Sequence, residues 1–343
     1  MVQVKSKKIF NISNEILLKC GLPAEDAAIV SDTILDAHKK GKHTHGLGRL
    51  QIYSRKIDEG WMAPVTDLKQ IKNNAAVAVY DAQNGFGQVA ANKGMDICTE
   101  KAKEYGIGAV AIKNSNSFGI AGYYGEIAVK KGLIGIVMGN ASPAIVTPGG
   151  KKSIMGTNPI SYAFPGTKNH PPVIYDIACS VVARSKIRQA VKNGESIPKD
   201  WAVDAEGNPT DDPVKAIDGM LNAIGGYKGF GLALTVDILA GLLSGSAFGG
   251  EVKALNAPKG FSRYGFFLMA IDPKVFLEEE EYTEKMDQLI DNVKSCGEPG
   301  EVYLPGERSY LMTLRNSADV GLNEKIINEV NELALKKDIA IRL

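Results

Sequence analysis

The feature that most constrains the fold is an alternation of strand-like and helix-like segments that begins near residue 66. The strand-like runs are short and apolar, whereas the segments between them carry apolar residues at helical spacing. Alternation of this kind is typical of an α/β core that contains some parallel strands. We predict strands at 75–81, 107–114, 133–140, 158–165, 172–178 and 263–272, with helices at 88–106 and 121–132 among them.

Helical periodicity also marks the two ends of the chain and its middle. We predict helices in 8–40, 47–60, 182–193, 213–222, 279–295 and 322–337. The longest apolar run covers residues 229–245 and is interrupted by Asp237. Because this run is too short to span a bilayer comfortably, we expect a buried helix there and no membrane partner.

Charge and cysteine content exclude several classes of protein. Forty basic residues nearly balance 39 acidic ones, so the charge indicates no nucleic-acid partner and no membrane surface. The four cysteines lie far apart and form no CxxC pair, which is typical of reduced thiols in a cytoplasmic protein. The N-terminus, "MVQVKSKKIFNIS", lacks the apolar segment of a secretory signal. We therefore expect a cytoplasmic location.

One glycine-rich segment looks like a dinucleotide fingerprint. A strand runs into Gly85 and Gly87, Ala90 takes the third position, and a helix follows. However, the polar stretch "DAQN" separates the strand from Gly85, and the next strand ends in Lys113 and Asn114 instead of an acidic residue. We therefore interpret the glycines as a tight turn before a packed helix.

Three of the four histidines lie close together, at positions 38, 43 and 45. A zinc site would need three converging ligands, but the spacing is not HExxH, and the segment after Gly41 has the pattern of a loop or a helix start. We predict no metal site. For His38 and His43 we expect a solvated helix end, where a histidine is favourable near a helix C-terminus.

His45 differs from the other two because of its neighbours. Thr44 supplies a hydroxyl, Gly46 allows close approach of a ligand, and Arg49 offers a planar fork of donors that suits a carboxylate. A histidine can give or take the proton that accompanies hydride transfer, which typically contributes about 10²–10⁴ in rate. This pattern favours an acid/base site for a 2-hydroxy or 2-oxo acid.

The segment "HTHGLGRL" resembles the "SHGxxR" motif of the type 2 malate/L-lactate dehydrogenases. That family also includes sulfolactate, ureidoglycolate and diketogulonate dehydrogenases. The resemblance extends in order over nearly the whole chain, through "NGFGQVAANKGMD", "GIGAVAIKNSNSFGIAGYY", "GTNPISYAFP", "DIACSVVARSKI", "IPKDWAVDAEGNPTDDP", "GGYKGFGLAL" and "LPGERSY".

The resemblance implies a non-Rossmann α/β fold and a homodimer. A discontinuous, helix-rich domain would comprise residues 1–75 and 270–343. Residues 76–269 would form a central NAD(P)-binding domain with a mixed sheet and an inserted helical part. The glycines at 85 and 87 would then be structural, in agreement with the interpretation above.

The resemblance also places the cofactor, NAD with NADP as an alternative. A lysine beside glycines can neutralise a pyrophosphate, and the segment "IACSVV" offers backbone donors and a small hydroxyl. Arg184 and Lys186 are candidates for a 2′-phosphate contact or for a solvated helix face. The implied cofactor contacts are Asp176, Ala178, Ser180, Val182, Tyr227, Lys228, Pro305, Gly306 and Glu307.

The chain departs from the family pattern at one important position. Ser117 stands where many members carry a second active-site histidine, in "NxxHFG". We therefore expect His45 to do the acid/base work, with Ser117 only hydrogen-bonding. Thr44 in place of the usual serine keeps the hydroxyl. For Cys179 we expect a buried, inert thiol instead of a reactive one.

These observations predict an NAD(P)-dependent oxidoreductase acting on a small 2-hydroxy acid, with malate/oxaloacetate as the leading pair. His45 would exchange the proton, Arg49 would hold the carboxylate, and Thr44 and Ser117 would orient the substrate. The sequence near Arg49 contains no second basic residue that is an obvious ligand for a distal carboxylate of the substrate, although the loop 143–157 contains two lysines. Alternatives are a lactate, sulfolactate or ureidoglycolate dehydrogenase, a cyclic-imine or sugar-acid reductase on the same fold, and a metal-dependent hydrolase.

Overall fold

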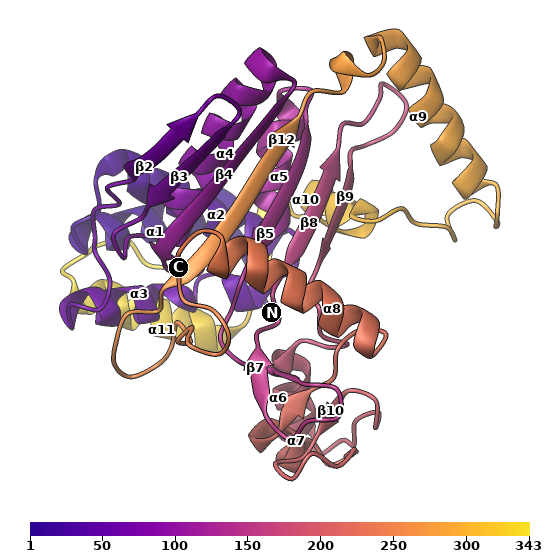
Figure 1. The fold of residues 1–343 in the computed structure, drawn as a ribbon. Coiled ribbons are helices and arrows are strands. Elements are labelled where there is room, and N and C mark those ends of the chain that lie inside the picture. Colours follow the sequence, from indigo (N-terminus) through magenta and orange to yellow (C-terminus); the bar gives the residue numbers. More distant parts are fainter.

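A seven-stranded mixed sheet forms the centre of the protein in a computed structural model that describes residues 1–343 (Figure 1). Only β3 and β4 run parallel in this sheet, and every other neighbouring pair is antiparallel. Within this sheet, the predicted parallel strands are thus confirmed for a single pair. In spatial order the strands are β2 (Lys69–Asn74), β3 (Val77–Asp81), β4 (Ile107–Ser115), β12 (Tyr264–Ile271), β5 (Ile134–Gly139), β8 (Ile160–Phe164) and β9 (Val173–Ile177).

Two helices cover one face of this sheet, behind the strands in Figure 1. Helix α4 (Gly87–Tyr105) forms the crossover between β3 and β4, and α5 (Ala121–Lys130) packs beside it on β5 and β8. Phe118 packs on Phe266 with 4.6 Å between ring centroids, in a cluster of 22 buried apolar residues. This contact with β12 holds the loop that precedes α5 against the sheet.

The two ends of the chain form a second packed region. Strand β1 (Val2–Lys5) pairs antiparallel with β13 (Asp319–Leu322). A cluster of 24 buried apolar residues joins the helices of this region, which are α1 (Ser6–Lys19), α2 (Ala24–Lys39), α3 (Arg49–Asp58) and α11 (Glu324–Lys336). The division into domains at residues 75/76 and 269/270 stays a prediction.

A small lobe projects from one end of the sheet (Figure 1). It has its own core of seven buried residues, and its helices are α6 (Arg184–Asn193) and α7 (Pro213–Asp218). The helix predicted over 213–222 was too long, because β11 (Met220–Leu221) pairs with β10 (Ala202–Val203) and with β6 (Ile145–Val146). Strand β7 (Ser153–Met155) completes this four-stranded sheet. Helices α9 (Glu279–Lys294) and α10 (Glu307–Arg315) follow β12.

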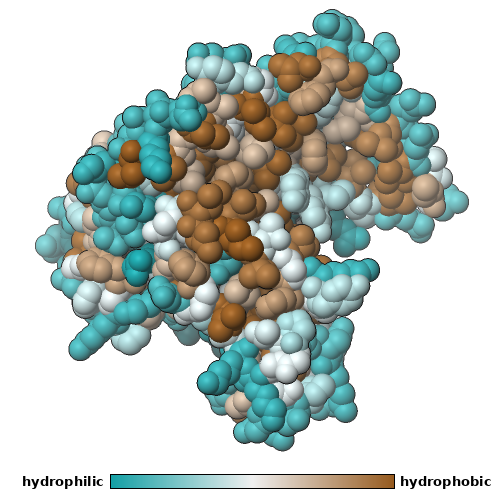
Figure 2. Space-filling view, viewed as in Figure 1, coloured by the Kyte–Doolittle hydropathy of each residue, from teal (hydrophilic) through white to brown (hydrophobic).

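The apolar run 229–245 forms a helix, but the prediction that this helix is buried was wrong. Helix α8 (Tyr227–Val236) continues into the π-helix η2 (Asp237–Leu242), which packs on the sheet. Its outer face is apolar and open, with Leu242 52% and Leu243 56% exposed (Figure 2). No helix of the chain combines the length and hydropathy that crossing a membrane would require.

Candidate active site

The four predicted catalytic residues line one cavity of about 570 Å³. Residues of the turn before α3 and residues of the β4–α5 loop contribute to it, and the small lobe supplies another part of the wall. Of the predicted cofactor contacts, Ala178 and Ser180 line the same cavity. The structure thus brings Ser117 together with Thr44, His45 and Arg49, a segment about 70 residues earlier in the chain.

A short turn presents Thr44 and His45. Gly41 ends α2 with a φ of +70°, and His43–His45 form a single 3₁₀ turn, η1, before α3 begins at Arg49. Arg49 Nε donates a hydrogen bond to the Thr44 carbonyl at 2.9 Å, which holds the guanidinium beside the turn.

The expectation of a solvated helix end was wrong for His38, which is only 2% exposed. Its Nε2 accepts a hydrogen bond from the Leu47 amide at 2.9 Å, and its Nδ1 lies 3.0 Å from His43 Nδ1. Burial lowers the pKa of His38 to about 4, so the ring is neutral and able to accept from Leu47. His43 is exposed, as expected. His38 therefore contacts a residue before His45, His43, and a residue after it, Leu47.

His45 is the best-placed titratable group in the cavity. Its Nδ1 is buried and has no hydrogen-bond partner in the protein. Burial, together with the positive charges of Arg49 and Lys42, lowers the pKa of His45 to about 4, although Asp176 opposes that shift. At neutral pH the ring is a neutral base with one nitrogen available to a ligand.

Ser117 reaches the cavity because the glycine-rich segment packs beneath it. A Cβ at Gly87 would lie 2.0 Å from the Asn116 carbonyl oxygen, and one at Gly85 would lie 2.8 Å from Thr66 Cα. The Asn116 side chain also donates to the Gly85 carbonyl at 2.9 Å. Protein atoms thus occupy the space that a pyrophosphate would need, which confirms the interpretation of these glycines as structural.

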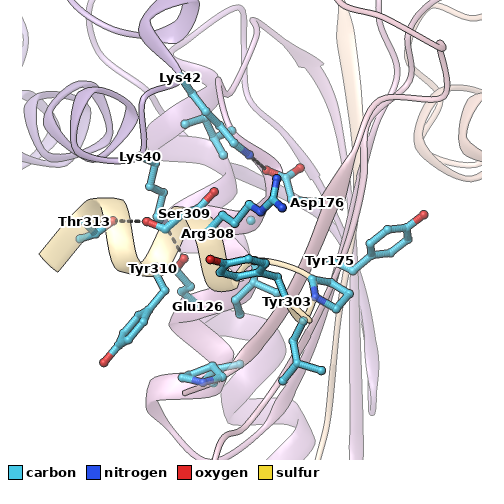
Figure 3. A pocket seen from close by; sticks show the side chains of 18 of the residues that line it. Lys40, Lys42, Glu126, Tyr175, Asp176, Tyr303, Arg308, Ser309, Tyr310 and Thr313 are labelled. Atoms are coloured by element: carbon cyan, nitrogen blue, oxygen red, sulfur yellow. Dashed lines mark hydrogen bonds and ion pairs between the residues drawn. The ribbon is translucent and has the colours of Figure 1, made fainter. Parts of the chain in front are cut away.

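A second cavity, of about 950 Å³, is lined by Lys42, Asp176 and Ile177 (Figure 3), whereas the adjacent residues His43 and Ala178 line the first cavity. Asp176, Pro305 and Gly306 line it, so it contains three of the predicted cofactor contacts. Lys42 Nζ and Asp176 Oδ2 are 2.5 Å apart, which ties the histidine-bearing turn to the end of β9.

The deep end of this second cavity holds a charged cluster (Figure 3). Lys40 Nζ lies 2.9 Å from Asp36 and 2.5 Å from Glu126, and its side chain is only 9% exposed. Burial raises the pKa of Asp36 to about 6, although Lys40 opposes that shift. Arg308 stacks over the Tyr303 ring, 4.5 Å from its centroid, and both residues line the cavity.

The remaining predicted cofactor contacts lie outside both cavities. Val182 is 6% exposed and packs in the core of the small lobe. Tyr227, 73% exposed, and Lys228 begin α8. Glu307 Oε1 lies 2.5 Å from Lys294 Nζ, and Glu307 Oε2 accepts from the Leu304 amide. Nothing in the sequence distinguishes these positions from the ones that do line a cavity.

The structure adds Arg188, which the sequence did not indicate, to the cavity wall, and it also places the candidate Arg184 there. Arg184 and Arg188 line the His45 cavity, whereas the two lysines of the loop 143–157 do not. The guanidinium of Arg184 donates to the carbonyls of Ile217 at 2.7 Å and Gly219 at 3.2 Å, a role that neither sequence alternative for Arg184 anticipated. Both arginines lie too far along the chain from Arg49 for spacing to reveal them.

Two other predicted properties of the site can be compared with the structure. Cys179 is fully buried, as expected, and burial raises the pKa of its thiol to about 11. No three histidine, cysteine, aspartate or glutamate side chains are arranged to hold a metal ion.

A nicotinamide cofactor fits the residues better. His45 Nδ1 has no protein partner, and a Cβ at Gly119 would project into open space. The two cavities adjoin through the Asp176–Ala178 segment.

Comparison with known proteins gives consistent matches over almost the whole chain. The family model described as malate/L-lactate dehydrogenase matches residues 4–331. The L-sulfolactate dehydrogenase of Methanocaldococcus jannaschii is 38% identical over 321 residues, covering 93% of this chain and 92% of that protein. Its solved structure superimposes with a TM-score of 0.93 at 37% identity, covering 99% of this chain and 98% of that one.

Two further relatives carry other names. A malate dehydrogenase of Pyrococcus horikoshii is 36% identical, with 97% of this chain and 95% of that protein covered. A protein of Chromohalobacter salexigens named (2R)-3-sulfolactate dehydrogenase (NADP(+)) is 34% identical, with 92% and 93% covered.

Proposed function

This chain belongs to the malate/L-lactate dehydrogenase family, and we propose that it interconverts a small 2-hydroxy acid and the corresponding 2-oxo acid with NAD(P). Malate/oxaloacetate is the leading pair, with sulfolactate, lactate and ureidoglycolate as alternatives, followed by a cyclic-imine or sugar-acid substrate. The observation that carries the proposal is the meeting of His45, Arg49 and Ser117 in one cavity. The chain offers no three-ligand set that would support a metal-dependent hydrolase instead.

In this mechanism Arg49 binds the C1 carboxylate through its Nη groups, because its Nε is engaged by the Thr44 carbonyl. The neutral imidazole of His45 accepts the proton of the 2-hydroxyl during oxidation and returns it to the carbonyl oxygen during reduction. The chemistry that a bound nicotinamide supplies is hydride exchange with C2 of the acid. The hydroxyls of Thr44 and Ser117 orient the substrate.

The charge of the substrate itself assists the proton transfer. Burial and Arg49 hold the pKa of His45 at about 4 in the free protein, which suits a base but not an acid. A carboxylate bound on Arg49 would offset the positive charge beside the ring and raise this pKa. His45 can then be protonated when a 2-oxo acid is bound and must receive the proton.

We propose that Asp176, Ala178, Ser180, Pro305 and Gly306 hold the cofactor, because these are the predicted contacts that line the two adjoining cavities. NAD is the proposed cofactor. NADP is the alternative, since one relative is named for it.

The test is a set of initial rates with 2-oxo acids, each measured with NADH and with NADPH. We expect oxidation of the reduced cofactor with oxaloacetate or 3-sulfopyruvate at saturable rates. Absence of turnover with every 2-oxo acid and both cofactors would contradict the proposed function.

We further propose that the protein acts as a homodimer. The open apolar face of α8 and η2 continues onto half-exposed apolar residues of the sheet, such as Phe267 and Met269 (Figure 2). A monomer rarely leaves so large an apolar patch in water. Sedimentation equilibrium should give twice the 36.7 kDa chain mass, and a monomeric mass at micromolar concentration would refute the dimer.

A further inference from the structure

The permanently charged side chains that line the His45 cavity are all positive. Three arginines contribute to its wall, and no aspartate or glutamate does. None of the three forms an ion pair with a carboxylate elsewhere in the protein. Because an unpaired arginine in a cavity favours an anionic ligand, this wall is suited to more negative charge than one carboxylate carries. The three arginines are Arg49, Arg184 and Arg188.

These charges come from two different elements, α3 and α6. Arg49 is on α3 and lies close enough to His45 to lower its pKa. Arg184 and Arg188 are one turn apart on α6, in the small lobe, and Arg188 lowers the pKa of Arg184 in addition to the effect of burial. Like charges at this spacing destabilise a helix, so the pair is not explained by the stability of α6.

Of the two arginines on α6, Arg188 is the one whose guanidinium is free to bind a ligand. Arg184 is anchored by the carbonyls of Ile217 and Gly219. Arg188 makes no hydrogen bond to the protein, its side chain is exposed, and it lines the cavity next to Ser185. An exposed guanidinium without a partner can reach toward a ligand at low conformational strain.

We propose that Arg188 determines substrate specificity by binding the second acidic group of a dianionic 2-hydroxy acid, either a carboxylate or a sulfonate. The inference rests on the proposed function, because it assumes that Arg49 takes the C1 carboxylate. We assign the second acidic group to the substrate because Arg188 lines the cavity that holds His45 and Arg49, whereas Asp176, Pro305 and Gly306 of the proposed cofactor contacts line the other cavity. Monoanionic acids such as lactate lack the group that Arg188 would bind.

The kinetic test compares Arg188→Gln with the wild type for oxaloacetate and pyruvate. We expect kcat/KM for oxaloacetate to fall about 10- to 100-fold relative to that for pyruvate, the loss of one charge-assisted contact. For Arg188→Lys we expect a ratio between those of the wild type and Arg188→Gln, since lysine keeps the positive charge but cannot form two parallel hydrogen bonds. Lys192→Gln, an exposed position one turn further along α6, is the control and should leave the ratio unchanged.

A binding measurement separates failure of this inference from failure of the proposed function. Calorimetric titration of the NADH-saturated protein with L-malate or L-lactate involves no turnover, because hydroxy acid and reduced cofactor cannot react. We expect the wild type to bind malate more tightly than lactate and Arg188→Gln to lose that preference. Equal binding of both acids by the wild type, or a preference retained in Arg188→Gln, would overturn the inference even if the enzyme turns over 2-oxo acids. A raised Kd for NADH or NADPH in Arg188→Gln, with the malate preference intact, would instead assign Arg188 to the cofactor.

Discussion

Replacement of Gly46 by alanine tests the packing that positions His45. A Cβ on Gly46 would lie 2.2 Å from His38 Nε2 and 2.6 Å from its Cδ2. The φ of Gly46 is −92°, a value that residues with side chains also adopt, so the clash with the ring is the main obstacle. His38 is buried, and its ring cannot move without losing the hydrogen bond from the Leu47 amide.

Two energetic costs determine how far Gly46→Ala should lower the free energy of unfolding. Forcing a methyl group into a packed interior typically costs about 1–3 kcal/mol. Leaving the amide of the fully buried Leu47 without its acceptor costs about 1–3 kcal/mol more. We therefore expect Gly46→Ala to lower the free energy of unfolding by about 2–6 kcal/mol. For a chain of 343 residues, this corresponds to a fall in Tm of about 3–8 °C.

The assay is thermal and urea unfolding followed by circular dichroism, together with kcat/KM for the best 2-oxo acid. Gly48→Ala is the matched stability control, because its Cβ would meet only Ile326 Cδ1, at 3.4 Å, and its backbone is helical. It should change the free energy of unfolding by less than about 1 kcal/mol. In a His38→Ala background the Gly46→Ala change should be much less destabilising, since the ring is gone. An unchanged Tm and kcat/KM in Gly46→Ala would refute this reasoning.

Three further predictions concern the charges around the site. Arg49→Lys should raise KM for the 2-oxo acid at least about 10-fold more than KM for the cofactor, because the bidentate grip on the carboxylate is lost; equal changes would count against the clamp. In the oxidation direction, kcat/KM should stay level down to about pH 5 and fall as His45 is protonated near pH 4, whereas a fall centred at pH 6.5 would contradict the lowered pKa. Because the pKa of His38 is lowered on folding, the unfolded chain binds an extra proton there between pH 6.5 and 4, and stability is lost as the pH falls through that window. Over this range the free energy of unfolding of the wild type should fall by on the order of 3 kcal/mol more than that of His38→Asn. Asp36 contributes with the opposite sign, but it is present in both proteins and cancels in the comparison. Parallel pH profiles of the two proteins would disprove the assignment.

Local periodicity predicted most of the elements because the signals are local. The helix expected over 88–106 is observed as Gly87–Tyr105, and the strand expected over 107–114 as Ile107–Ser115. The pairing of β1 with β13 joins segments at opposite ends of the chain and has no local signal. The run 229–245 is apolar enough to predict a buried helix, because composition alone does not distinguish a buried helix from one with an exposed apolar face.

Spacing groups the cavity residues that are adjacent in the sequence, whereas Ser117 was assigned only by the resemblance and Arg188 was missed. Thr44, His45 and Arg49 fall within one turn and the start of one helix, so spacing alone placed them together. The burial of His38 depends on an amide nine positions later, which periodicity cannot reveal. Arg188 enters the cavity only because the small lobe folds back toward α3.

The most direct test of the central claim is the turnover of His45→Gln with the best 2-oxo acid and its preferred reduced cofactor. Glutamine keeps a similar size and polarity but cannot exchange a proton. We predict that kcat falls about 10²- to 10⁴-fold, while cofactor affinity, followed by fluorescence, changes less than about twofold. A kcat close to that of the wild type would contradict the role of His45 and, with it, the proposed mechanism.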